Sequence, residues 1–145
     1  MVGQEAKFGI ESELRVTATN VTQALMEEIK TKKWDQNSPI PPGTASTTLG
    51  PESATYDDID DFNNLPPWND TTCTDTVNVN NVVFTREVDV CYVNPTTLGD
   101  CLGTKTNCTR SGATPTDYKK ITVTVRAPAT NWDSSVELMT VMTNY

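Results

Sequence analysis

Residues 118–125, with the sequence YKKITVTV, alternate apolar and polar side chains more regularly than any other stretch of the chain. Ile121, Val123 and Val125 would share one face of a strand, and the threonines between them would share the other, because side chains alternate in direction along a strand. This alternation is typical of a strand with one buried face and one solvated face. It therefore predicts a strand of a sheet.

Three further stretches indicate strands in the same part of the chain. Residues 77–84 alternate with a slip at Asn80-Asn81, residues 87–93 alternate after an expected turn at Thr85-Arg86, and residues 134–143 alternate again. Strands that follow one another closely in sequence favour an antiparallel meander. We therefore expect a sheet of about four strands over residues 77–145, with a disulfide-bearing loop between the second and third strands.

One apolar stripe near the N-terminus predicts a helix over residues 4–33. A helix of that length would be about 45 Å long, so its first turns should project beyond a domain of this size. Its second half should cover the apolar face of the sheet. The stripe follows helical steps of three and four residues and consists of Ile10, Leu14, Ala18, Val21, Leu25 and Ile29.

The segment between helix and sheet, residues 35–76, shows no periodic pattern and holds six of the nine prolines. We expect it to be a long variable loop, with an ordered part at residues 56–65, where apolar side chains recur every third position. The expected organisation is a single domain over residues 1–145. The fold class is α+β: a long N-terminal helix packed on a C-terminal antiparallel sheet of about four strands.

The composition excludes several classes of function. The chain has 11 basic and 19 acidic side chains, a net charge of −8, and no histidine. Without histidine there is no Ser–His–Asp triad, no Cys–His dyad and no imidazole ligand for a metal. The acidic balance argues against nucleic-acid binding, which needs a basic face. We therefore expect a protein that is not an enzyme and does not bind nucleic acid.

Four cysteines in a small, Thr- and Asn-rich acidic chain indicate an oxidising compartment and two disulfides. They are Cys73, Cys91, Cys101 and Cys108, with no Cys-x-x-Cys pair that would favour zinc or thioredoxin chemistry. Three connectivities are open. We favour Cys73–Cys91, which would tie the long loop to the sheet, with Cys101–Cys108, which would close a small loop.

An acidic cluster in the long loop is the main candidate for chemistry. Carboxylate oxygens without histidine suit Ca²⁺, although the spacing matches no EF-hand loop. The alternative, which we favour, is that the carboxylates cap a short helix or accept hydrogen bonds from loop N–H groups. No other cofactor is expected. The candidate ligands are Asp57, Asp58, Asp60 and Asp61, to which Asn63, Asn64 and Asp70 could add oxygens.

Three patches carry a resemblance to a known family. Residues 25–35 (LMEEIKTKKWD) resemble the end of a pilin helix, and residues 56–63 (YDDIDDFN) resemble an acidic, aromatic-flanked loop of minor pilins. Residues 119–125 (KKITVTV), followed by Val-Glu-Leu at 136–138, resemble the last two pilin strands. The chain resembles type IV pilin-like proteins, in particular minor pilins of the mannose-sensitive haemagglutinin pilus class.

This resemblance implies a structural subunit of a type IV pilus that packs against other pilin or pseudopilin subunits and depends on the pilus assembly machinery. It implies a precursor anchored in the bacterial inner membrane, facing the periplasm, by an apolar half-helix outside this sequence; the mature N-terminus would be methylated, and the subunit would end in an extracellular pilus. The alternatives are a pseudopilin of a type II secretion system and a pilus-tip adhesin or ligand-binding module that uses Trp68, Trp132 and Tyr118. The helix face expected to serve the core and the subunit contacts is Ile10, Leu14, Val21, Leu25 and Ile29.

Overall fold

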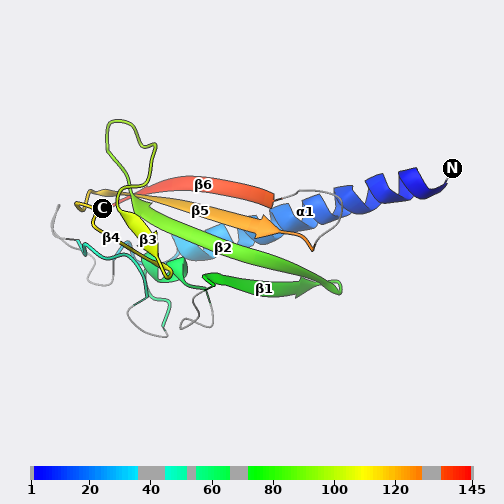
Figure 1. Ribbon diagram of the computed structural model, residues 1–145, viewed down its shortest axis with the longest axis horizontal. Helices are drawn as coiled ribbons and strands as arrows, with labels where there is room; N and C mark the ends of the chain where they lie inside the picture. Colours follow the sequence, from blue (N-terminus) through cyan, green and yellow to red (C-terminus); the bar gives the residue numbers. More distant parts are fainter. Residues whose placement is uncertain (1, 36–44, 52–54, 66–71, 129–134, 145) are drawn as a thin grey trace.

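The protein is described from a computed structural model, which covers residues 2–35, 45–51, 55–65, 72–128 and 135–144; for residues 2–11 only the backbone is described. The described elements are one α-helix, one 3-10 turn and six strands (Figure 1). In chain order they are α1 (Val2–Lys30), η1 (Asp60–Asn63), β1 (Thr74–Val79), β2 (Val82–Tyr92), β3 (Thr104–Thr106), β4 (Thr109–Ser111), β5 (Tyr118–Arg126) and β6 (Ser135–Thr143).

The larger sheet has four antiparallel strands in the order β1-β2-β5-β6. Its register places Val123 of β5 opposite Val88 of β2 on one side and Leu138 of β6 on the other. Strands β3 and β4 form a separate two-stranded sheet within the connection between β2 and β5. The β1–β2 turn is made by Asn80 and Asn81, both at positive φ, a conformation that asparagine tolerates well and that two-residue hairpins need.

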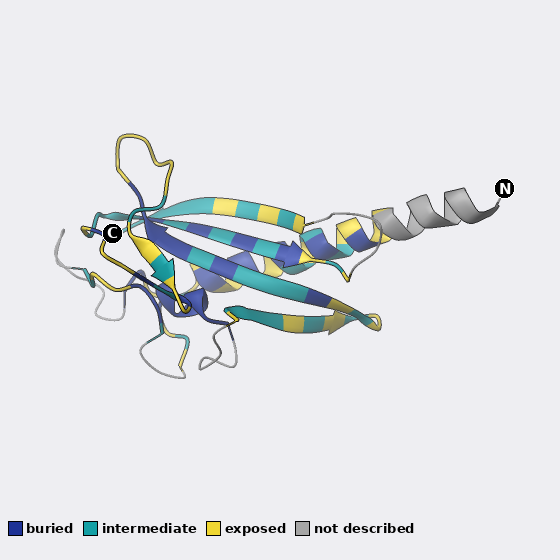
Figure 2. Cartoon of the chain, viewed as in Figure 1, coloured by how far each residue is buried: buried dark blue, intermediate teal, exposed yellow. Residues whose placement is uncertain are grey.

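The core lies between the second half of α1 and the central strands. Helix α1 contacts β5 and β6, whereas η1 contacts β2. Figure 2 shows the buried residues concentrated along β2 and β5, with the edge strands β1 and β6 more exposed. On β5 the buried positions are every second residue, as a sheet with one covered face requires. The core residues of α1 are Leu14, Ala18, Leu25, Met26 and Ile29.

The structure corrects the expected fold class, in which a long helix was packed on a single sheet of about four strands. Among the described residues, strands outnumber the one helix, contain more residues than it does, and form two sheets rather than one. The first turns of α1 extend beyond the strand ends, as expected (Figure 1). The reason is geometric: a 29-residue helix is about 44 Å long, whereas even the 11 residues of β2 span only about 37 Å.

Several expected boundaries were also wrong. Thr85 and Arg86 lie in the middle of β2, and the turn is at Asn80-Asn81 instead. Strand β1 begins at Thr74, inside the segment expected to be a loop, and α1 ends at Lys30 rather than at residue 33. The small sheet β3–β4 was missed because strands of three residues are too short to show a period.

Candidate functional site

Two aspartates of the acidic segment hold its backbone in shape. Asp58 Oδ1 accepts hydrogen bonds from the backbone N–H groups of Asp60 and Asp61, at 3.0 and 3.2 Å. Asp61 Oδ2 accepts them from the N–H groups of Asp57 and Asp58, at 2.9 and 3.1 Å. Both side chains are buried, and Asp57 is exposed. Aspartate commonly stabilises turns in this way, and here the paired carboxylates set the entry into η1.

A third aspartate of the segment, Asp60, joins η1 to the sheet through a buried lysine. Lys119 Nζ lies 2.6 Å from Asp60 Oδ1 and 3.9 Å from Asp35 Oδ2, and it donates to the carbonyl oxygen of Trp34 at 2.7 Å. Its side chain is fully buried, 4.2 Å from the centroid of the Trp34 ring. The cluster joins the helix exit, η1 and β5, which are distant in sequence. A buried cation needs such compensation from charge, hydrogen bonds and aromatic faces.

Burial controls the acid–base behaviour of the segment. Burial raises the pKa of Asp60, and the charge and hydrogen bond of Lys119 oppose that rise. Burial also raises the pKa of Asp61, while the hydrogen bonds from the N–H groups of Asp58 and Asp57 lower it by a smaller amount. Tyr56, whose hydroxyl donates to the carbonyl of Asn64 at 2.6 Å, has a pKa raised to about 12, chiefly by burial and then by the charges of Asp61 and Asp75.

Asn63, the last residue of η1, ties this segment to the free edge of β2. Its Nδ2 donates to the carbonyl oxygens of Val90 and Leu49, at 3.0 and 3.3 Å, and its Oδ1 accepts from the N–H of Val90 at 2.6 Å. Strand β1 pairs with β2 only as far as Thr74 opposite Glu87. The Asn63 side chain therefore supplies Val90 with the partners that a neighbouring strand would otherwise provide.

The predicted calcium ligands are thus close in sequence but have separate roles. Asp58 and Asp61 bind loop N–H groups, Asp60 binds Lys119, and Asn63 binds β2. This arrangement supports the alternative in which the carboxylates accept hydrogen bonds from loop N–H groups. Calcium binding stays a prediction, and a titration followed by thermal shift tests it. Asp70 lies outside the described residues.

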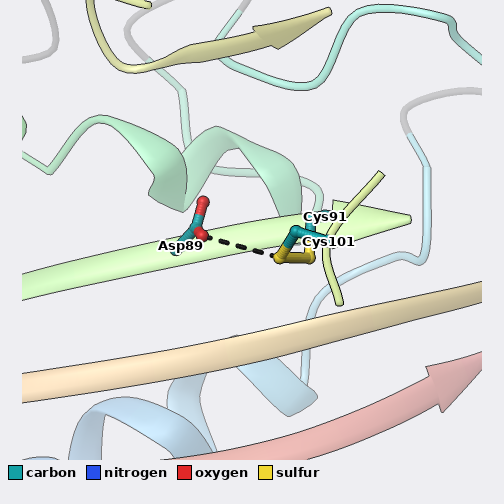
Figure 3. Close-up of side chains that lie close together, drawn as sticks. All are labelled: Asp89, Cys91 and Cys101. Carbon is teal, nitrogen blue, oxygen red and sulfur yellow. Dashed lines mark hydrogen bonds between the residues drawn. A yellow bond between two sulfur atoms is a disulfide. The ribbon is translucent and has the colours of Figure 1, made fainter. Parts of the chain in front are cut away.

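In the described part of the chain, one group of three side chains brings potential metal-ligand atoms within 4.8 Å of one another: Asp89, Cys91 and Cys101 (Figure 3). Cys91 and Cys101 form a disulfide, so neither offers a thiolate to a metal. Asp89 Oδ2 is 3.7 Å from Cys101 Sγ, which has no proton to donate. Both carboxylate oxygens instead accept from a single nitrogen of Arg110, Nη2, at 2.8 Å for Oδ2 and 3.1 Å for Oδ1, and the contact holds the small sheet against β2.

The two disulfides are Cys73–Cys108 and Cys91–Cys101. All four cysteines are therefore paired, as expected, but the favoured pairing of Cys73 with Cys91 and Cys101 with Cys108 was wrong. The first bond ties the start of β1 to the β3–β4 turn, and the second closes the connection that leaves β2. Spacing alone could not separate the three connectivities, because the hairpin that carries Cys108 was not recognised.

The residues of the predicted helix face differ in how far their side chains are buried. Leu14, Leu25 and Ile29 are buried, and Val21 packs against the core while partly exposed. The side chain of Ile10 lies outside what the structure describes.

Near Leu14, a groove of about 530 Å³ separates α1 from the β1–β2 hairpin. It is lined by Ser12, Glu13, Leu14, Val16 and Thr17 of the helix and by Val79, Asn80, Val82 and Phe84 of the hairpin.

The aromatic set proposed for a ligand surface is only partly placed. Trp68 and Trp132 lie outside the described residues, and Tyr118 is half-buried at the start of β5. The third tryptophan, Trp34, is a core residue beside Tyr92, with ring centroids 6.1 Å apart. Trp34 therefore serves the fold, as most tryptophans do.

Lys119 was not among the predicted site residues of this region. A signal was present, since Lys119 has the same parity as Ile121, Val123 and Val125, and β5 buries all four. A lysine on the apolar parity of a strand predicts a buried cation, which in turn requires a carboxylate partner.

No family model, no curated protein and no solved structure matches the chain. The similarity to pilins therefore depends on the three sequence patches alone. Within the described residues, no helix is both long enough and apolar enough to cross a membrane.

Proposed function

We propose that the protein is a minor pilin, a non-enzymatic structural subunit of a type IV pilus that assembles with other pilins through α1. The observation that carries the proposal is the position of this helix: its first turns extend past the strand ends (Figure 1). Backbone that projects in this way offers a helical surface to neighbouring chains. The sequence patches that resemble pilins are a second and independent support.

The part of α1 at the rim of the sheet also has apolar surface to offer. Val16 is 61% exposed and lines the groove beside α1, where it faces Val79, Val82 and Phe84 from the hairpin. An exposed apolar side chain beside a groove with apolar walls favours contact with another chain. Glu13 at the same groove would help to select the partner, since charges at an interface act mainly on specificity.

On this proposal the subunit is held in the bacterial inner membrane, facing the periplasm, until the pilus assembly machinery adds it to the extracellular filament. The two disulfides support an oxidising compartment of this kind. The membrane anchor would be an apolar segment that precedes α1 in the gene product. The N-terminal sequence of the gene product is the direct check on that segment.

A photo-crosslinking residue introduced at Lys7 or Glu11 tests the helix contacts without adding a cysteine to a chain with two disulfides. We expect crosslinks to other pilins in sheared filaments. Filaments that form normally, with no crosslink from either position, would contradict the proposal. Crosslinks exclusively to subunits of a secretion system would instead assign the chain to a pseudopilus.

A matched pair of substitutions tests the apolar surface. Val16→Asp places a charge on the exposed apolar rim, whereas Gln23→Asp places the same charge on an exposed helix position outside the groove lining. We expect Val16→Asp to lower incorporation into filaments while Gln23→Asp does not, with both proteins folded by circular dichroism. Equal incorporation of the two variants would refute a role for this surface.

A further inference from the structure

The Lys119–Asp60 ion pair places an amine beside a carboxyl group, two groups that can also react with each other. Nζ and Oδ1 are 2.6 Å apart, and the exposed fractions of the two side chains are 0% and 2%. The aromatic rings of Trp34 and Tyr92 lie 4.2 and 5.5 Å from Nζ. A primary amine and a carboxyl group are thus held in contact where water is excluded. Such positioning replaces a bimolecular encounter by an intramolecular one.

We propose that Lys119 Nζ and the Asp60 side-chain carboxyl group condense to an intramolecular isopeptide bond. The proton between them moves from the ammonium to the carboxylate along their hydrogen bond, which leaves a neutral amine and a carboxylic acid. Nζ attacks Cγ, the new N–C bond forms, and the bond between Cγ and the protonated Oδ1 breaks. The hydroxyl group leaves with a proton from the nitrogen as one water molecule, so no oxidant, reductant or other reactant is needed.

Two neighbouring groups are placed to assist this step. Asp35 Oδ2, 3.9 Å from Nζ, is the nearby carboxylate that can take the proton from nitrogen and deliver it to the departing oxygen. The backbone N–H of Gly50 donates to Asp60 Oδ2 at 3.2 Å and would stabilise the negative charge that develops there during attack. Asp35 therefore lies near the attacking nitrogen, and the Gly50 N–H lies at the carboxyl oxygen that the reaction retains.

The product would leave its polar groups paired. The remaining amide N–H keeps the carbonyl oxygen of Trp34 as acceptor, and Oδ2, now the amide oxygen, keeps the N–H of Gly50 as donor. The reaction removes two opposite charges from a buried site, where each is costly to maintain. Burial also raises the pKa of Asp60, which favours the protonated carboxyl that the reaction uses.

The bond would join residues 59 apart in sequence and link η1 covalently to β5. Neither disulfide reaches this part of the long loop, since Cys73 lies after it. The inference does not depend on a role in pili, and its test is a measurement of mass rather than of assembly.

Intact-mass spectrometry of the denatured, reduced protein tests the proposal. We expect a mass lower than that of the full sequence by one water molecule, together with a branched tryptic species that joins the peptides containing Asp60 and Lys119. The full sequence mass for the folded wild-type protein would overturn the proposal.

Three variants locate the reaction. Lys119→Arg keeps a buried cation but removes the amine, and it should show its full mass. Asp35→Asn keeps both reactants and should leave most molecules uncondensed. Lys120→Arg, at the neighbouring position on β5, should lose the water like the wild type. Loss of water from Lys119→Arg would overturn the bond, and unchanged condensation in Asp35→Asn would overturn the proton-transfer role of Asp35.

Discussion

Substitution of Asn63 by alanine tests how the acidic segment is attached to the sheet. The wild-type amide bonds the N–H and the carbonyl of Val90 and also the carbonyl of Leu49, and it is fully buried. Alanine removes all three bonds. The backbone groups of Val90 lie on the edge of β2 beyond the point where its pairing with β1 ends. Among the described residues, no strand would therefore replace the lost partners.

The expected cost follows from those orphaned groups. A buried N–H left without an acceptor costs about 1–3 kcal/mol, and the carbonyl oxygens add to this because they lose their donors. A small cavity forms as well. The total should be about 2–4 kcal/mol, which corresponds to a Tm lower by roughly 5–15 °C for a domain of this size.

Urea and thermal unfolding with the disulfides intact provide the assay, and Asn78→Ala provides the control. Asn78 is an exposed residue of β1, so its replacement should change stability by less than about 0.5 kcal/mol. Asn63→Asp adds a second comparison: it can still accept the N–H of Val90 but cannot donate to either carbonyl. Equal stability of Asn63→Ala and Asn78→Ala would refute the edge-capping argument.

Three further predictions follow from the same structure. Replacing both cysteines of Cys73–Cys108 by serine should destabilise the protein by about 4 kcal/mol, and the same change at Cys91–Cys101 by about 3 kcal/mol, because the closed loops span 35 and 10 residues. Urea unfolding measures both losses, and the reverse order would contradict the loop-entropy argument. Gly103→Ala should lower the Tm more than Gly112→Ala. Both glycines have a φ of 78°, but a Cβ at Gly103 would lie 2.5 Å from a backbone oxygen, whereas one at Gly112 would meet nothing within 4 Å. Similar Tm values for the two variants would contradict this. The pKa of Tyr56 is raised from 10.0 to about 12, so the protein should lose stability as the pH rises from 10 to 12, because folding favours the protonated hydroxyl. Tyr56→Phe should show a smaller loss over that pH range, and a pH profile identical to that of the wild type would count against the shift.

Local patterns predicted the elements whose periodicity is long enough to read. The three- and four-residue steps from Leu14 to Ile29 predicted the buried side of α1, and alternation in residues 118–125 predicted β5. Both patterns arise because one side of each element meets the core, which imposes its own period on the sequence. The Asn80-Asn81 turn also had a local signal, two residues suited to positive φ, but it was interpreted as a slip within a strand.

In the acidic segment, local patterns predicted some of the side-chain roles but not others. Its composition indicated turn-forming carboxylates, and Asp58 and Asp61 serve in that way through bonds to N–H groups two to four residues away. The roles of Asp60 and Asn63 depend on partners 59 and 27 residues away, which no local pattern identifies.

The chain's own residue pattern was sufficient for the helical stripe, the alternation in β5 and the oxidised cysteines, because these depend on neighbours along the chain and on composition. Folding in three dimensions decided the pairing of the cysteines, the burial of Lys119 between Asp60 and Trp34, and the use of Asn63 as a substitute for a missing strand. The physical reason is the same in each case. A buried charge or an open strand edge must be satisfied by whatever group the fold brings within hydrogen-bond reach, and that group is chosen by topology rather than by distance along the sequence.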